Sequence, residues 1–140
     1  MKFQYYAVAI LLLFIACDKT KDVPVPANES LIAGKWKQTE AYISDAGPHY
    51  WVTIENGEEI SFSDDGSFTS NRFPDCNGGI YSIEEGTLLL NYDCDELDAE
   101  LFNTEGFVTY NLEFYKSYFL LTPTSGPICI EGCSYKYQSQ

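Results

Sequence analysis

The sequence predicts an all-β protein, an antiparallel up-and-down β-barrel of about eight strands. Apolar and polar side chains alternate over short segments, as at Val108, Tyr110, Leu112 and Phe114. Turn-forming residues, such as the SDDG sequence at residues 63–66, separate these segments at close intervals. The sequence has no long helical period. Closing the sheet would remove the exposed edges of an open meander, so a barrel is the expected arrangement.

The chain starts with the pattern of a signal peptide that ends immediately before a cysteine. Lys2 supplies a positive start, residues 7–15 are an uninterrupted apolar core, and the small Ala16 precedes Cys17. This apolar run is too short to span a bilayer as a helix. We therefore expect residues 1–16 to be a removed signal peptide, with Cys17 as the first residue of the mature chain.

Residues 14–17, Phe-Ile-Ala-Cys, resemble the lipobox of bacterial lipoproteins, in which the thiol is joined to a diacylglycerol before a peptidase cuts in front of it. The resemblance implies lipidation of Cys17 with diacylglycerol and palmitate. It implies attachment to the bacterial cell envelope, with the outer membrane, at its periplasmic or surface face, as the expected location. Two or more acyl chains suffice for stable attachment to the membrane, because each buried methylene contributes about 0.8 kcal/mol. An ordinary secretory signal cut near Ala16 is the alternative.

The mature chain would have the length of one domain and a strongly acidic composition. It would have 140 − 16 = 124 residues, with 8 − 1 = 7 basic and 21 acidic side chains, and a formal charge of 7 − 21 = −14. Such a surface repels nucleic acid and anionic headgroups, which excludes both as partners. Residues 17–29 contain two prolines and alternating charges, so we expect a flexible tether there and the barrel domain at 30–140.

The predicted strands follow one another with short connections. They cover residues 35–43, 50–54, 60–62, the region of 68, 79–83, 87–92, 108–114, 118–122 and the segment with Tyr135 and Tyr137. The least regular region, residues 93–106, is expected to be a loop with a helical turn. Its run of carboxylates favours a solvated acidic loop, with weak calcium binding as the alternative.

Four cysteines remain beside Cys17, an even number in an exported protein, and they allow three pairings: Cys76, Cys94, Cys129 and Cys133. The first two are equally far along the chain from Glu85, in the predicted turn at residues 84–86. A register that pairs Ile83 with Thr87 would place these two cysteines opposite each other, within disulfide reach. We expect disulfides 76–94 and 129–133. Zinc is the competing interpretation, but C-x3-C without a nearby histidine fits metal spacing poorly.

The sequence LIAGKW at residues 31–36 resembles the G-x-W entrance of the lipocalin fold. Residues 60–69 and the ending at 129–137 are similar to the lipocalin-like domains of small bacterial lipoproteins, so the resemblance covers residues 30–137. It implies a calycin-type barrel in which a short turn closes one end and Trp36 packs under the floor. The chain lacks the family's terminal arginine over this tryptophan, and Lys136 is the candidate for its place.

Aromatic residues are abundant, with 11 tyrosines, nine phenylalanines and two tryptophans, and most are expected to build the scaffold. An eight-stranded barrel is either filled by its own side chains or holds one small ligand. The residues expected to face inward are candidates for ligand binding: Trp36, Phe62, Phe68, Tyr81, Leu90, Tyr110, Leu112 and Phe114.

The expected function is the binding of a small, mostly apolar ligand in the barrel. The alternative is a filled barrel that binds a protein or a glycan through its rim, where Tyr50 and Trp51 are expected. An enzyme is not expected. His49, the single histidine, lies in a predicted loop, and nothing in the sequence places a nucleophile beside it. No cofactor and no resident metal are expected.

Overall fold

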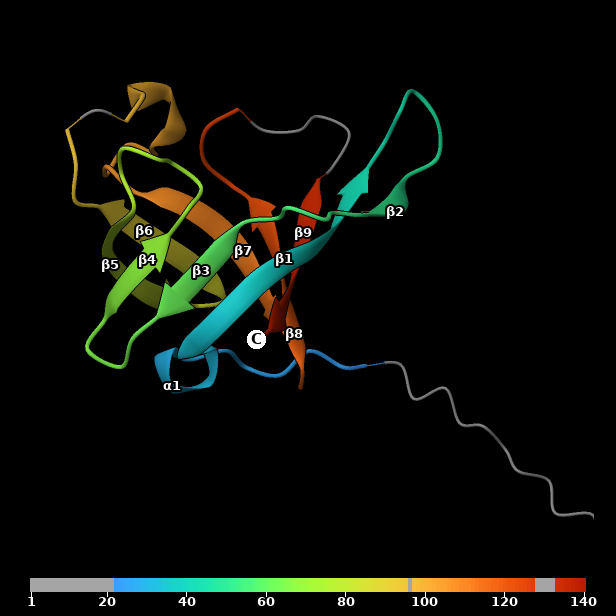
Figure 1. Ribbon diagram of the computed structural model, residues 1–140, viewed down its shortest axis with the longest axis horizontal. Helices are drawn as coiled ribbons and strands as arrows, with labels where there is room; N and C mark the ends of the chain where they lie inside the picture. Colours follow the sequence, from blue (N-terminus) through green and yellow to red (C-terminus); the bar gives the residue numbers. More distant parts are fainter. Residues whose placement is uncertain (1–21, 96, 128–132) are drawn as a thin grey trace, which may run out of the picture.

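The computed structural model describes residues 22–95, 97–127 and 133–140, which form a closed antiparallel β-barrel (Figure 1). The barrel closes because β9 pairs with both β8 and β1. The elements of the described chain are α1 (Glu29–Ile32), β1 (Gly34–Ile43), β2 (Tyr50–Thr53), β3 (Glu59–Phe62), β4 (Ser67–Ser70), β5 (Gly78–Glu84), β6 (Thr87–Tyr92), the 3-10 helix η1 (Ala99–Leu101), β7 (Val108–Phe114), β8 (Tyr118–Pro123) and β9 (Ser134–Ser139). The predicted all-β up-and-down barrel is confirmed.

The barrel has eight strands because β2 and β3 are two parts of one returning strand. The first half of β1 pairs with β3, from Gly34 opposite Phe62, and its second half pairs with β2. The interruption lies at Gly57, where an added Cβ would stand 2.0 Å from the backbone oxygen of Gln38. Only glycine allows this close approach. The end of β1 and β2 project from the barrel as a ribbon (Figure 1), which we call the β1–β2 ribbon.

The hairpin of β5 and β6 has a different register from the predicted one. Ile83 lies opposite Leu88 rather than Thr87. The turn therefore has two residues, Glu85 and Gly86, with φ of 48° and 81°. Two positive φ angles are the mark of a type I′ turn, whose twist matches that of the strands. The predicted three-residue turn was wrong for this reason.

The predicted disulfide between Cys76 and Cys94 is nevertheless confirmed, with Cα atoms 5.8 Å apart. Both cysteines lie just beyond the paired part of the β5–β6 hairpin, and the bond ties the β4–β5 loop to the end of β6. Cys133 also takes part in a disulfide. Its expected partner, Cys129, lies outside the described residues, so the 129–133 pairing remains a prediction.

One end of the barrel is closed by α1 and by Trp36. Asn28 caps this short helix, accepting a hydrogen bond from the backbone N–H of Leu31 at 3.0 Å. The indole N–H of Trp36 donates to the carbonyl of Ile32 at 2.7 Å, and the ring lies 4.8 Å from that of Phe119. The tryptophan therefore joins the helix to the barrel floor.

The expectation that Lys136 stacks over this tryptophan was wrong. Side chains alternate along a strand, and on β9 Tyr137 points into the barrel, so Lys136 points outward. Its ammonium instead lies 2.6 Å from a carboxylate oxygen of Glu40 and 4.9 Å from the ring centroid of Tyr118. Phe119 contacts Trp36 in its place.

The chain reaches the barrel before residue 30. Val25 forms an isolated bridge with Phe114, donating its N–H to that carbonyl at 2.8 Å. Residues 1–21, with the predicted signal peptide and Cys17, lie outside the described residues. Among the helices that the structure describes, none has the length and apolar character needed to cross a membrane.

Candidate functional site

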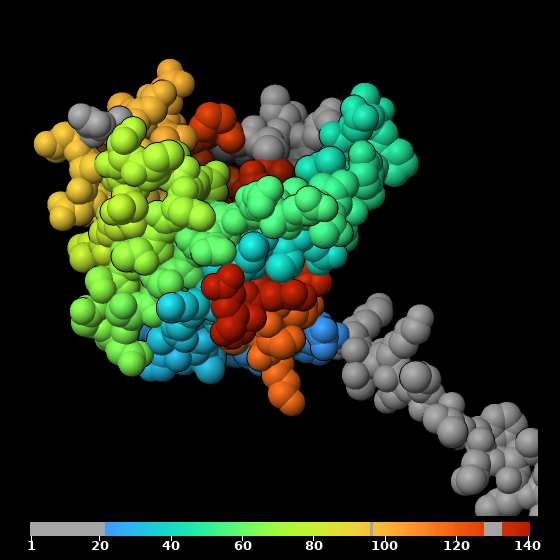
Figure 2. All heavy atoms as spheres, viewed as in Figure 1, coloured from blue at the N-terminus to red at the C-terminus, as the bar shows by residue number. Residues whose placement is uncertain are grey.

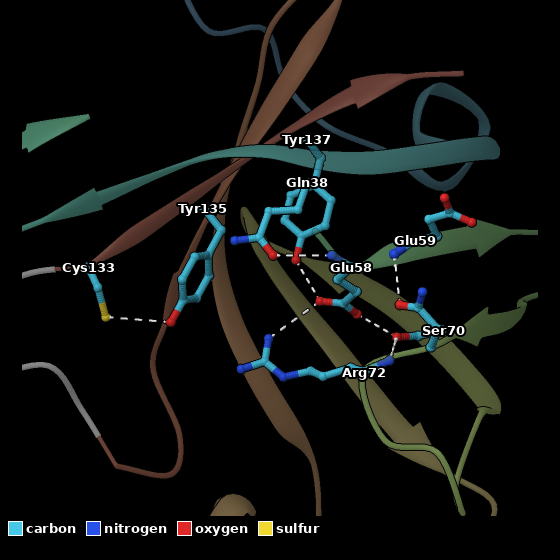
Figure 3. A network of polar contacts seen from close by, with 9 residues as sticks. Gln38, Glu58, Glu59, Ser70, Arg72, Cys133, Tyr135 and Tyr137 are labelled. Carbon is cyan, nitrogen blue, oxygen red and sulfur yellow. Dashed lines mark hydrogen bonds and ion pairs between the residues drawn. The ribbon is translucent and has the colours of Figure 1, made fainter. Parts of the chain in front are cut away.

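The barrel interior differs between its two ends. Near α1 it is filled by apolar side chains. The eight residues predicted to line a ligand site are all buried, each at most 6% exposed. At the end away from α1 the interior is polar (Figure 3). We call the residues there the mouth cluster: Glu58, Ser70, Arg72, Tyr92, Tyr110, Tyr135 and Tyr137.

Glu58 is the buried anion of this cluster. It follows Gly57 and lies immediately before β3, and only 8% of its side chain is exposed. One carboxylate oxygen accepts a hydrogen bond from the hydroxyl of Ser70, and the other accepts from the hydroxyl of Tyr137 at 2.7 Å (Figure 3). A buried carboxylate is costly unless it is hydrogen-bonded. These two neutral donors therefore satisfy the carboxylate largely without a cation.

Arg72 is the cation of the cluster and comes from the loop after β4. Its backbone N–H donates to the Ser70 hydroxyl at 3.0 Å, and its Nη1 lies 3.4 Å from the second Glu58 oxygen. The guanidinium carbon lies 5.8 to 5.9 Å from the centroids of three rings, those of Phe73, Tyr110 and Tyr135. Such contacts hold a planar guanidinium in place. About a third of this side chain, 33%, remains exposed.

Tyrosine hydroxyls surround the ion pair. The hydroxyl of Tyr92 is buried and makes no well-aligned hydrogen bond among the described residues, although the Ser70 hydroxyl lies close enough to act on its pKa. Burial raises the pKa of Tyr92, and it raises the pKa of Tyr110 to about 12 despite the opposite effect of nearby Arg72. Burial and the neighbouring Glu58 raise the pKa of Tyr137 well above its ordinary value. These hydroxyls stay protonated at neutral pH and can donate hydrogen bonds.

A mostly apolar hollow of about 310 Å³ adjoins the cluster. It lies between the β4–β5 loop and the segment around η1, which are seen side by side in yellow-green and gold at the upper left of Figure 2. Its lining residues are Phe73, Pro74, Asp75, Cys76, Leu97, Asp98 and Leu101. Phe73 belongs to this wall and also contacts the Arg72 guanidinium. The Cys76–Cys94 disulfide fixes the same wall.

The structure separates the predicted ligand-lining residues into two groups. Tyr110 belongs to the mouth cluster, whereas Trp36, Phe62, Phe68, Tyr81, Leu90, Leu112 and Phe114 pack on one another in the core. Glu58 and Arg72 were not predicted as site residues from the sequence. One signal was available, because Arg72 is the single arginine of the chain and stands beside an aromatic residue.

The predicted rim residues lie on the β1–β2 ribbon, apart from the mouth cluster. Tyr50 and Trp51 are 46% and 41% exposed. The ring of Tyr42 lies between those of His49 and Trp51, with centroids at 5.3 Å and 5.1 Å. His49 is exposed and makes no hydrogen bond within the described part of the chain. Tyr42, His49 and Trp51 therefore form an aromatic stack on the surface of the ribbon.

Comparison with known proteins identifies the fold. No protein-family model and no curated protein sequence matches the chain. Among solved structures, it is similar to a lipocalin-like protein from Bacteroides uniformis, with a TM-score of 0.50 and 17% sequence identity over 79% of this chain and 99% of that chain. At this identity the similarity establishes a shared lipocalin-like barrel. Ligand-binding capacity is a property that this barrel form can support.

Proposed function

We propose that the protein is a non-catalytic lipoprotein of the bacterial envelope, anchored through Cys17, whose barrel binds a small, mostly apolar ligand at the end away from α1. The lipobox-like sequence at residues 14–17 supports the anchor. The lipocalin-like barrel and its mouth cluster support the binding of a ligand.

The observation that carries this proposal is a buried hydroxyl that makes no well-aligned hydrogen bond. The Tyr92 hydroxyl is fully enclosed, and its neighbours within the described residues are the Ser70 hydroxyl, which already donates to Glu58, and the Arg72 guanidinium, which is only partly engaged. An unsatisfied buried polar group costs about 1–3 kcal/mol, so a fold retains one where it has a use. A ligand atom that accepts a hydrogen bond would remove this cost.

Binding would follow from burial of apolar surface beside the cluster. The hollow next to Phe73 offers apolar walls, and each Å² of apolar surface removed from water contributes about 25 cal/mol. The hydroxyls of the mouth cluster would orient the polar end of the ligand, as a few placed polar groups do in most small-molecule sites.

Native co-purification tests the ligand. The barrel is isolated from its own envelope without denaturation, and bound small molecules are released and identified by mass spectrometry. The proposal expects one class of small apolar compound, present in near-stoichiometric amount and reduced in an Arg72→Gln variant. Recovery of no small molecule, together with failure of an apolar dye to bind, would refute it.

The anchor has a separate test. Labelled palmitate should enter the wild-type protein and not the Cys17→Ala variant, and only the wild type should sediment with membranes. Ser134→Ala is a matched control, because it leaves the anchor region unchanged. Sedimentation of the Cys17→Ala variant with vesicles would contradict lipid anchoring.

A second candidate function is recognition of a glycan or a protein through the β1–β2 ribbon. The exposed stack of Tyr42, His49 and Trp51 favours it, because exposed aromatic faces are typical of such contacts. A Trp51→Ala variant should then lose binding to envelope polysaccharide or to a partner protein while keeping its small-molecule ligand. Unchanged binding to both would exclude this function.

A further inference from the structure

We propose that Arg72 binds a carboxylate, so that the ligand class is small apolar acids. The inference rests on the proposed function and specifies the polar end of the ligand. Arg72 presents a partly exposed guanidinium at the mouth of the barrel, beside Phe73 of the apolar hollow and near the buried Tyr92 hydroxyl.

The guanidinium has hydrogen-bonding capacity to spare. It carries five N–H donors, and within the described residues only one, on Nη1, reaches an acceptor. Three aromatic rings have their centroids 5.8 to 5.9 Å from its central carbon, and rings do not use up its N–H donors as an oxygen acceptor would. A carboxylate accepts two parallel N–H bonds from one such edge, which is the geometry that favours arginine over lysine.

Glu58 does not use up this capacity. Its contact with Arg72 spans 3.4 Å, longer than the roughly 2.7–2.9 Å of a strong charge-assisted hydrogen bond. Its two oxygens are already held by Ser70 and Tyr137. Glu58 therefore engages the guanidinium only weakly, and the other N–H donors of Arg72 can bind a ligand carboxylate.

The surroundings favour one negative charge rather than two. Glu58 lies close to the same guanidinium, so a dianionic phosphate would be repelled more strongly than a carboxylate. The protein as a whole carries a formal charge of −13, which disfavours anions elsewhere on its surface. An anion should therefore bind at Arg72 through direct hydrogen bonds, with its apolar part against Phe73 and the hollow of about 310 Å³.

The test compares three probes with the same chain and different ends: octanoate, octan-1-ol and octyl phosphate, titrated calorimetrically below their micelle concentrations. The wild type should bind octanoate at least ten times more tightly than octan-1-ol, and more tightly than octyl phosphate. In Arg72→Gln this preference should disappear, and a urea unfolding curve with the wild-type slope shows that the variant is folded. Lys37→Gln, the same charge change on the outer surface beside Glu59, should keep the preference.

Glu58→Gln gives a result of opposite sign. Removing the competing carboxylate should tighten octanoate binding several-fold, and by more than it changes octan-1-ol binding. Equal affinity of the wild type for octanoate and octan-1-ol would overturn the inference and leave the proposed function standing. A preference that persists in Arg72→Gln, or tighter binding of octyl phosphate, would overturn it as well. Binding of none of the three probes would refute the proposed function and this inference together.

Discussion

The hydroxyl of Tyr137 holds the buried Glu58 inside the barrel, and its removal should measurably destabilise the fold. Tyr137 is fully buried, its hydroxyl donates to the Glu58 carboxylate at 2.7 Å, and its ring stacks on Phe119 at 5.0 Å. Tyr137→Phe removes the hydrogen bond and keeps the ring. A hydrogen bond to a charged group contributes about 1.5–3 kcal/mol, so we expect unfolding to become easier by about 2 kcal/mol.

Urea unfolding of the disulfide-intact protein measures this change. The midpoint should fall while the slope stays the same, because the surface exposed on unfolding is unaltered. Tyr42→Phe is the matched control, since the Tyr42 ring also stacks on a neighbour but its hydroxyl makes no hydrogen bond within the described chain. Its stability should change by less than about 0.5 kcal/mol. If the free energy of unfolding falls equally little in both variants, the hydrogen bond from Tyr137 to Glu58 does not stabilise the barrel.

Three further predictions concern the barrel itself. Burial raises the pKa of Tyr110 to about 12 from an ordinary 10.0, so its contribution to stability should be intact below pH 10. About 3 kcal/mol of this contribution should be lost between pH 10 and 12, where the unfolded chain releases the proton first. Alkaline unfolding, followed by phenolate absorbance, measures the loss, and the Tyr110→Phe variant should lack it. Trp36→Phe leaves the Ile32 carbonyl without its indole donor and should lower the free energy of unfolding, measured in urea, by about 1–3 kcal/mol. An unchanged free energy of unfolding would show that this hydrogen bond at the barrel floor does not stabilise the fold. Replacing Cys76 and Cys94 together by alanine removes the disulfide between two residues 18 apart in the sequence. The free energy of unfolding, measured by calorimetry, should fall by about 3 kcal/mol. A variant as stable as the wild type would contradict a structural role for the bond.

The strands and their order were predictable because alternation along the chain depends on local residues alone. The β7 segment, for example, alternates apolar and polar side chains from Val108 to Phe114, and the structure buries its apolar members. The β5–β6 register was missed because a positive φ at Glu85, which is not a glycine, has no clear sequence signal. Lys136 was misplaced because the resemblance suggested a role that the alternation with Tyr137 excludes.

The candidate site was less predictable than the fold. Tyr110 was expected to face inward, and it does. Arg72 belongs to a loop, and its position over Tyr110 and Tyr135 depends on how three distant segments come together when the barrel closes. Glu58 reads as a surface carboxylate in a run of acidic residues, and only the close approach at Gly57 turns the chain so that it is buried.

Nuclear magnetic resonance of the labelled protein can locate a small apolar ligand at the mouth cluster. Extracts of the envelope, and then octanoate, are added while backbone and side-chain signals are followed. The largest shifts should fall on Arg72, Phe73 and Tyr110, with the Arg72 side-chain N–H signal among them. Shifts confined to Tyr42 and Trp51 on the β1–β2 ribbon, or no shifts at all, would contradict the account.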